Sequence, residues 1–328
     1  MRRLRAGAAA LFGAVALVAP DGRAQTAAPA PEVCVIHPGE PASAQARIVP
    51  QLTAGLREQR IEVGRDAVLT WRGASFAWDR LPGLAAGCVA RRARVIAAIS
   101  PIGVAAARAA TRTIPIVAHD LETDPVAGGI VASLARPGGN LTGVYFDFPD
   151  FGAKWRELVA EALPGARRIG LLWDPATGPS RVAEIRTLAA ARGFTLIEQE
   201  MPDLASVDAR FRTFVGADTQ AVLLLSSPLI GGNAALFAAA AKTHRLPAIT
   251  MYSQFAEAGG LMAYGPDLQE TFHPLGELIG KILRGADPGT LPIDRPSRLR
   301  LVVNLTTAKA LGVTLSPSLL GRADEVIE

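Results

Sequence analysis

Short apolar runs alternate with longer segments of mixed polarity along most of the chain. The runs at residues 33–37 and 94–99 show little polar alternation, which is typical of parallel strands buried on both faces. The segments between such runs carry apolar residues at helical spacing and end near Gly or Pro. The pattern predicts a first series with strands at 33–37, 67–71, 94–99, 114–118 and 141–145 and helices at 43–60, 77–92, 101–111 and 125–134.

A second series with the same alternation follows. Its strands are predicted at 168–173, 194–199, 220–225 and 248–251, and its helices at 151–163, 180–192, 204–216 and 233–244. A tail then adds a helix at 267–283, which Pro274 should kink or start later, and a strand at 299–303. Two strand-helix series without sequence repetition predict an α/β protein of two doubly wound lobes with parallel sheets.

The crevice of such a fold lies at the carboxyl ends of its strands, where helix N-termini also present free N–H groups. Polar or aromatic residues that directly follow the predicted strands are therefore candidate ligand contacts. In the first lobe they are His37, Trp71, Ser100, His119 and Asp120, and in the second lobe Tyr145, Asp174, Ser226, Ser227 and Tyr252. Trp71 would form an aromatic wall with Phe76 and Trp78, or these rings would pack in the core.

Some of these candidates have both a ligand interpretation and a structural one. Ser100 precedes a proline and suits either a helix N-cap or, with the free amides beyond it, a ligand carboxylate. Asp174 also precedes a proline and either neutralises a ligand ammonium or organises its turn. Asp120, Glu122 and Asp124 form an acidic loop after the fourth strand, where Asp124 is expected to cap the next helix.

The N-terminus has the composition of a secretory signal peptide. Three arginines within the first five residues precede an apolar stretch at 6–19, and Gly22 and Ala24 suit cleavage before Gln25. The apolar stretch is too short to span a bilayer, and the first cysteine, at position 34, is too distant for a lipoprotein. We expect residues 1–24 to be removed and the mature protein to work free in the periplasm.

Composition narrows the functional classes further. A chain of 328 residues with 49% hydrophobic composition can bury the cores of two domains. The formal net charge of +4 falls to +1 without residues 1–24, which hold four arginines and one aspartate, so no nucleic-acid partner is expected. Cys34 on the first strand and Cys88 on the second helix either form a disulfide or remain two buried thiols.

Motifs of enzymatic chemistry are missing from the sequence. The four histidines are scattered, without HExxH or metal-ligand spacing, and there is neither a GxSxG elbow nor a GxGxxG after a strand. Residues 276–281 are one residue short of the P-loop spacing and lie in a helical pattern. From the motifs alone we therefore expect no catalytic residues, cofactor or metal.

A resemblance to a known family rests on several segments. They are Ile114-Pro115-Ile116-Val117, Asp120, Asp124-Pro125, Ser133-Leu134-Ala135-Arg136-Pro137-Gly138-Gly139-Asn140-Leu141-Thr142-Gly143-Val144 and the C-terminal run from Leu319 to Glu328. Together they resemble the bacterial ABC-transporter substrate-binding proteins that take up tryptophan and related amino acids, from about Val33 to Glu328. The chain departs from that pattern at His37-Pro38-Gly39-Glu40, where a Gly-Ser or Gly-Thr turn is more usual.

The resemblance implies a type I periplasmic-binding fold with several hinge crossings. Lobe 1 would cover 31–143 plus about 267–288, and lobe 2 about 144–266 plus 289–328. The resemblance also implies a binding protein and not an enzyme, whose lobes close on a small organic solute, an amino acid or another carboxylate, and dock on an ABC permease with its ATPase. The alternative is that the same two-lobed unit presents its ligand to a sensor. We expect a monomer that does not insert into the membrane.

Overall fold

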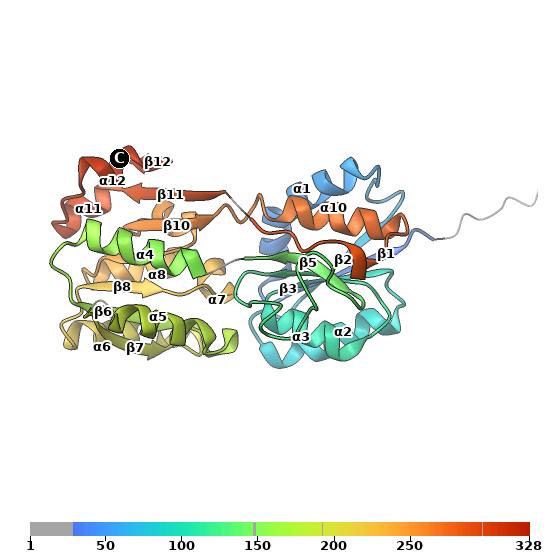
Figure 1. The fold of residues 1–328 in the computed structure, drawn as a ribbon, viewed down its shortest axis with the longest axis horizontal. Helices are drawn as coiled ribbons and strands as arrows, with labels where there is room; N and C mark the ends of the chain where they lie inside the picture. The colour runs from blue at the N-terminus through green and yellow to red at the C-terminus, as the bar shows by residue number, and fades with distance from the viewer. Residues whose placement is uncertain (1–28, 147–148, 192, 297) are drawn as a thin grey trace, which may run out of the picture.

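Two lobes, each built on a largely parallel β-sheet, lie side by side in the computed structural model (Figure 1). The structure describes residues 29–146, 149–191, 193–296 and 298–328. The predicted signal peptide at 1–24 lies outside the described residues. The alternation of strands and helices confirms the predicted fold class of two α/β lobes.

Lobe 1 contains a five-stranded sheet, entirely parallel, in the order β2-β1-β3-β4-β5. Its strands are β1 Glu32–His37, β2 Val68–Gly73, β3 Val95–Ile99, β4 Ile116–Asp120 and β5 Leu141–Tyr145. The three strands β3, β4 and β5 are buried along their whole length. Helices on both faces of the sheet explain why these sequences lack polar alternation.

Two pairs of helices cover the faces of this sheet (Figure 1). One pair is α1 Pro41–Glu58 with α10 Phe272–Leu283, and the other is α2 Leu81–Ala90 with α3 Pro101–Ala110. Gly55 and Gly276 bring α1 and α10 close together, because a Cβ at either position would collide with the backbone of the other helix. The tail of the chain thereby returns to lobe 1.

Lobe 2 contains a seven-stranded sheet in the order β12-β11-β10-β9-β8-β6-β7. Its strands are β6 Arg168–Trp173, β7 Thr195–Glu200, β8 Ala221–Leu224, β9 Ala248–Thr250, β10 Met262–Pro266, β11 Leu299–Asn304 and β12 Glu325–Ile327. The β10–β11 pair is antiparallel, whereas the other pairs are parallel. The strands β10 and β12 were not predicted from the sequence.

The helices of lobe 2 alternate with its strands. They are α4 Pro149–Ala162, α5 Ser180–Ala190, α6 Val207–Gly216, α7 Pro228–Gly232, α8 Ala234–Thr243, α9 Ser253–Glu257, α11 Leu305–Leu311 and α12 Pro317–Gly321. Single-turn 3₁₀ helices are η2 Pro175–Thr177 and η3 Leu204–Ser206 in lobe 2, and η1 Trp78–Arg80 and η4 Pro288–Thr290 beside the sheet of lobe 1. One continuous core, with Phe211, Phe214 and Phe237 fully buried, holds this lobe together.

The prediction of a helix at 125–134 was wrong, since the structure has turns there. Asp124 does cap the first turn, because its Oδ1 accepts hydrogen bonds from the N–H groups of Val126 and Ala127. Gly129 then adopts a φ of 62°, which ends the helical path. The late start predicted for the helix containing Pro274 is confirmed, because α10 begins only at Phe272.

The chain passes between the lobes after β5, after β10 and before β11. Before the last passage it pairs with lobe 1, where Asp294 exchanges backbone hydrogen bonds with Gly143 and Tyr145. The segment 289–294, which the family resemblance implied to be part of lobe 2, therefore lies against β5. Three connecting segments therefore join the lobes, which is an arrangement suited to a hinge.

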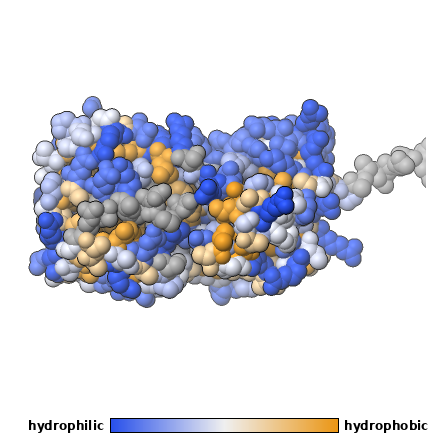
Figure 2. All heavy atoms as spheres, in the orientation of Figure 1, coloured by the Kyte–Doolittle hydropathy of each residue, from blue (hydrophilic) through white to orange (hydrophobic). Residues whose placement is uncertain are grey.

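Cys34 and Cys88 form a disulfide with a Cα–Cα distance of 5.9 Å, so the first of the two alternatives for these residues holds. The bond joins β1 to α2. Most of the face in Figure 2 is hydrophilic, with apolar side chains gathered in small patches. Among the described residues, no helix combines the length and the apolar character needed to cross a membrane.

Candidate functional site

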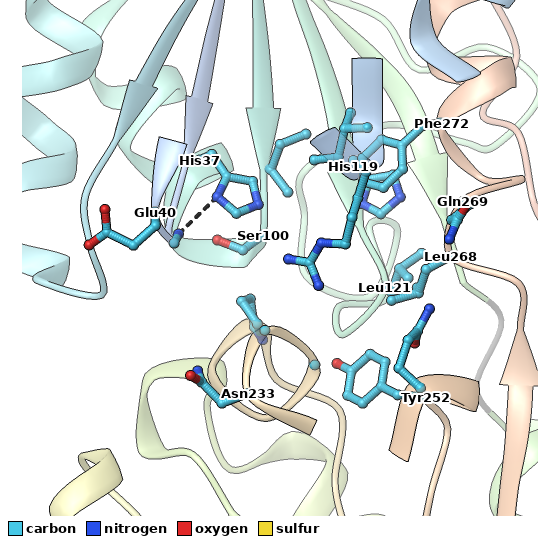
Figure 3. A pocket seen from close by; sticks show the side chains of 18 of the residues that line it. His37, Glu40, Ser100, His119, Leu121, Asn233, Tyr252, Leu268, Gln269 and Phe272 are labelled. Atoms are coloured by element: carbon cyan, nitrogen blue, oxygen red, sulfur yellow. Dashed lines mark hydrogen bonds between the residues drawn. The ribbon is translucent and has the colours of Figure 1, made fainter. Parts of the chain in front are cut away.

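A cavity of about 180 Å³ lies between the two lobes, at the carboxyl ends of their strands (Figure 3). Lobe 1 and the chain leading into α10 contribute His37, Gly39, Glu40, Arg47, Ile48, Phe76, Ile99, Ser100, His119, Leu121, Glu122, Leu268, Gln269 and Phe272. Lobe 2 contributes Pro228, Gly231, Gly232, Asn233, Tyr252 and Gln254. This is the crevice expected for open α/β sheets.

Ser100 stands between β3 and α3 and lines the cavity with 3% of its surface exposed. Its Oγ accepts a hydrogen bond from the N–H of Gly103 at 3.3 Å, so the predicted N-cap is present. Its φ of 76° and ψ of 159° belong to a region almost restricted to glycine, at a cost of about 1–3 kcal/mol. This strained turn brings the N-terminus of α3, with its free N–H groups, to the cavity wall.

Two histidines line the cavity on the side of lobe 1 (Figure 3). Both are neutral near pH 7. His37 accepts a hydrogen bond at Nδ1 from the N–H of Gly39 at 2.8 Å, and burial lowers its pKa to about 4. Burial also lowers the pKa of His119 to about 3, and its Nε2 lies 2.7 Å from the hydroxyl of Thr271. Neither imidazole therefore supplies a positive charge for a ligand near pH 7.

Phe76 extends from lobe 1 to lobe 2. A Cβ at Gly39 would lie 3.1 Å from the Cζ of Phe76, and a Cβ at Gly232 would lie 3.0 Å from the same atom. Trp78 supports this ring edge to face, with centroids 5.9 Å apart. Of the predicted aromatic wall, Phe76 lines the cavity, Trp78 packs against Phe76, and Trp71 packs under α1 and α10.

Two further aromatic rings line the cavity (Figure 3). Phe272 stacks on His119 with ring centroids 4.3 Å apart and planes 9° apart. Tyr252, on the lobe 2 side, packs so close to Gly231 that a Cβ there would lie 2.9 Å from its ring. The cavity therefore offers aromatic surface on both lobes.

A polar network crosses from lobe 1 to lobe 2 beside the cavity. The Oγ of Ser226 donates to Oε1 of Glu122 at 2.5 Å and lies 3.1 Å from the hydroxyl of Tyr252. The Tyr252 hydroxyl donates to the carbonyl of Ser227 at 2.9 Å and accepts from its N–H at 2.8 Å. Glu122, only 5% exposed, is thus held by the strand end of the opposite lobe.

A second buried carboxyl stands beside Glu122. Asp120 accepts hydrogen bonds at Oδ1 from the N–H groups of Glu122 and Thr123, both at 3.0 Å, and burial raises its pKa to about 6. Burial, and next the negative charge of Asp120, raise the pKa of Glu122 to about 7. Arg181 of α5 opposes both shifts, and its Nε donates to the carbonyl of Glu122 at 2.9 Å. Its Nη1 pairs with Glu184 at 3.2 Å.

The structure separates the nine predicted contacts into two groups. Those that line the cavity are His37, Ser100, His119 and Tyr252. Those that do not line it are Asp120, Tyr145, Asp174, Ser226 and Ser227, and their part in ligand binding stays a prediction.

Three of the second group have structural surroundings of their own. Asp174 accepts hydrogen bonds from the Oγ of Ser227 at 2.6 Å and from the N–H of Ala176 at 2.9 Å, so it organises the turn into η2. Tyr145 is 1% exposed, and its hydroxyl has no hydrogen-bond partner among the described residues.

Sequence reasoning missed several residues that line the cavity: Arg47, Glu122, Asn233, Gln254, Gln269 and Phe272. The acidic loop after β4 was a signal for Glu122. Gln269 and Phe272 could not be found from strand ends, because they enter the site where the tail returns to lobe 1.

Comparisons with known proteins agree with this architecture. A family model described as ABC transporter substrate binding protein matches residues 32–327. A tyrosine-binding protein from Clostridioides difficile is 25% identical over 258 residues, which cover 78% of this chain and 74% of that protein. A conserved domain protein from Vibrio cholerae superposes with a TM-score of 0.83 at 25% identity, covering 90% of this chain and 99% of that one.

A similar fold occurs in an ABC domain from Streptococcus pneumoniae in complex with L-Trp. It superposes with a TM-score of 0.82 at 21% identity, covering 91% of this chain and 100% of that one. Because the family model spans nearly all the described residues, the protein belongs to the ABC transporter substrate-binding protein family.

Proposed function

We propose that the protein binds one amino acid between its lobes and delivers it to an ABC permease. The observation that carries the proposal is a cavity with walls from both lobes, closed by a hydrogen bond from Ser226 to Glu122. A solute that touches both walls binds the closed arrangement more tightly than an open one, so it shifts the protein towards closure. The closed form is then the signal for the permease.

Aromatic amino acids are the ligand class that the cavity favours. An apolar cavity of about 150 Å³ holds one benzene ring, and this cavity measures about 180 Å³. Phe76, Phe272 and Tyr252 offer ring surface for stacked or edge-to-face contacts. The tyrosine-binding relative and the structure that holds L-Trp support the same class.

The ligand carboxylate has a candidate partner at the start of α3. Ser100 and the free N–H groups beyond it combine a hydroxyl donor with the positive end of the helix dipole. Arg47, an exposed residue of α1, adds a positive charge to the wall of the same cavity. These groups suit an anion, which an amino acid supplies.

We further propose that export through the predicted signal peptide brings the protein to the periplasm, where it acts as a monomer. Its partners are a membrane permease and the ATPase of that permease, as the family assignment supports. The solute leaves unchanged, because the proposed role is capture and delivery.

The direct test is isothermal titration calorimetry of the mature chain against the twenty L-amino acids. We expect one site that binds tyrosine, tryptophan or phenylalanine, and thermal unfolding that moves upward with ligand concentration. Solution scattering should show a smaller radius of gyration with ligand and unchanged secondary structure by circular dichroism. Absence of binding to every amino acid would contradict the proposal, and so would turnover of the bound solute.

A further inference from the structure

We propose that Glu122 recognises a protonated amine on the bound solute and thereby restricts the ligands to amino compounds. This inference rests on the proposed function, since it concerns the solute of the same cavity. Glu122 lines the cavity from the loop after β4, and its carboxyl accepts a hydrogen bond from Ser226 of the opposite lobe.

Glu122 differs in its burial from the other acidic and basic side chains that line the cavity. Among the described lining residues, the acidic and basic side chains other than the two histidines are those of Glu40, Arg47 and Glu122. Glu40 and Arg47 are exposed, whereas Glu122 is only 5% exposed. A buried carboxylate needs a nearby positive charge or a proton to offset the loss of water.

The surrounding protein supplies that positive charge only in part. The groups that face Glu122 come from each element packed against it. They are Asp120 at the end of β4, Arg181 from α5, Ser226 after β8 and Tyr252 before α9. Asp120 and Glu122 share the guanidinium of Arg181, which also pairs with Glu184. The two buried carboxyls, when ionised, therefore exceed the positive charge beside them.

An ammonium group on the ligand would offset this excess of negative charge. Without such a ligand, a proton on the carboxyl offsets it. Burial, and next the negative charge of Asp120, raise the pKa of Glu122, so without ligand the carboxyl holds a proton for part of the time near neutral pH. An ammonium within hydrogen-bond distance favours the ionised carboxylate and displaces that proton. A solute of the same shape without an amine leaves the proton in place.

The test compares L-tyrosine with 3-(4-hydroxyphenyl)propanoate, which has the same ring and carboxylate without the amine. Titration calorimetry is run on the wild type, Glu122→Gln and Asp124→Asn. The glutamine keeps an oxygen that can accept from Ser226, so the lobe contact is retained and only the charge is lost. Asp124 lies in the same loop outside the cavity lining and is the matched control.

We expect the wild type and Asp124→Asn to prefer tyrosine by about 10- to 150-fold, the range of a charged hydrogen bond. Glu122→Gln should lose most of that preference by binding tyrosine more weakly, while its affinity for the analogue stays the same or rises. A preference that survives in Glu122→Gln overturns the inference. An equal loss for both compounds also overturns it and assigns Glu122 to lobe closure.

A measurement on the wild type keeps the inference testable if Glu122→Gln does not fold. Binding enthalpies in two buffers of different ionisation enthalpy give the protons exchanged at pH 7. The complex with the analogue should hold more protons than the complex with tyrosine, because only tyrosine keeps Glu122 ionised. Equal proton numbers overturn the inference. Binding of both compounds with equal affinity overturns it while solute binding stands, and binding of no amino acid overturns the proposed function as well.

Discussion

Two substitutions of Ser100 distinguish the effect of its hydroxyl from the effect of its strained backbone. Ser100→Ala removes Oγ and keeps a Cβ at a φ of 76°, whereas Ser100→Gly removes Oγ and also relieves the strain. An N-cap changed to alanine costs about 1 kcal/mol, but one changed to glycine costs only about 0.3 kcal/mol. Relief of strain stabilises the glycine variant by about 1–3 kcal/mol. The free energy of unfolding should therefore be highest for glycine, lower for serine and lowest for alanine.

Ligand affinity should follow a different order, because it depends on the hydroxyl. If Ser100 Oγ donates to the ligand carboxylate, both variants lose a charge-assisted hydrogen bond of about 1.5–3 kcal/mol, which weakens Kd by about 10- to 150-fold. Urea denaturation of the ligand-free protein measures the first quantity, and titration calorimetry with L-tyrosine measures the second. Both assays use the same preparations, so stability and affinity are compared directly.

Two results would refute this reasoning at different points. Unchanged affinity in both variants would mean that the carboxylate is held elsewhere and that Ser100 serves only as the cap of α3. An alanine variant more stable than the glycine variant would mean that the backbone at Ser100 carries no strain.

Three further predictions concern lobe closure, the disulfide and pH. Ser226→Ala removes the 2.5 Å donor to Glu122, so ligand affinity should fall by about 1–3 kcal/mol in calorimetry with little loss of ligand-free stability; equal losses would contradict a closure role. Replacing Cys34 and Cys88 by alanine removes a cross-link over 54 residues and should cost about 4 kcal/mol of unfolding free energy in urea; an unchanged midpoint would contradict this. The folded pKa of His119, about 3, lies below its unfolded value of about 6.5, so its contribution is lost as pH falls below 6.5. Wild-type stability should therefore decrease relative to His119→Phe by about 2 kcal/mol from pH 7 to pH 5, and a constant difference would count against a buried neutral ring.

The sequence predicted most of the fold because buried strands and amphipathic helices have distinct periods. The helix expected at 125–134 shows the limit of this reasoning: Asp124 is a real cap, yet Gly129 stops the helix after one turn. Composition favoured a helix there, but a positive φ at one glycine decides the local path. The antiparallel pairing of β10 with β11 was also beyond the pattern, since an apolar run does not record the direction of its neighbour.

The sequence predicted that the candidate site lies at the edges of the two sheets, but not which side chains line it. Strand ends gave His37, Ser100, His119 and Tyr252, which line the cavity. Asp174 occupies an equivalent position, but its carboxylate accepts hydrogen bonds from its own lobe and does not line the cavity. A strand end specifies the edge of the sheet, while the direction of each side chain depends on local hydrogen bonds that the sequence pattern does not reveal.

Residues at the same strand ends form both the hydrogen bond between the lobes and part of the cavity wall. Glu122 and Ser226 each stand two residues beyond a strand, β4 in lobe 1 and β8 in lobe 2, and they meet across the gap. Because each lobe presents this edge to the other, a solute bound there lies among the residues that hold the lobes together. Substitutions that break the hydrogen bond between Glu122 and Ser226 must therefore alter closure and ligand recognition at once. Gln269 and Phe272 line the cavity beside α10, so substitutions there should change ligand preference while the hydrogen bond between the lobes remains.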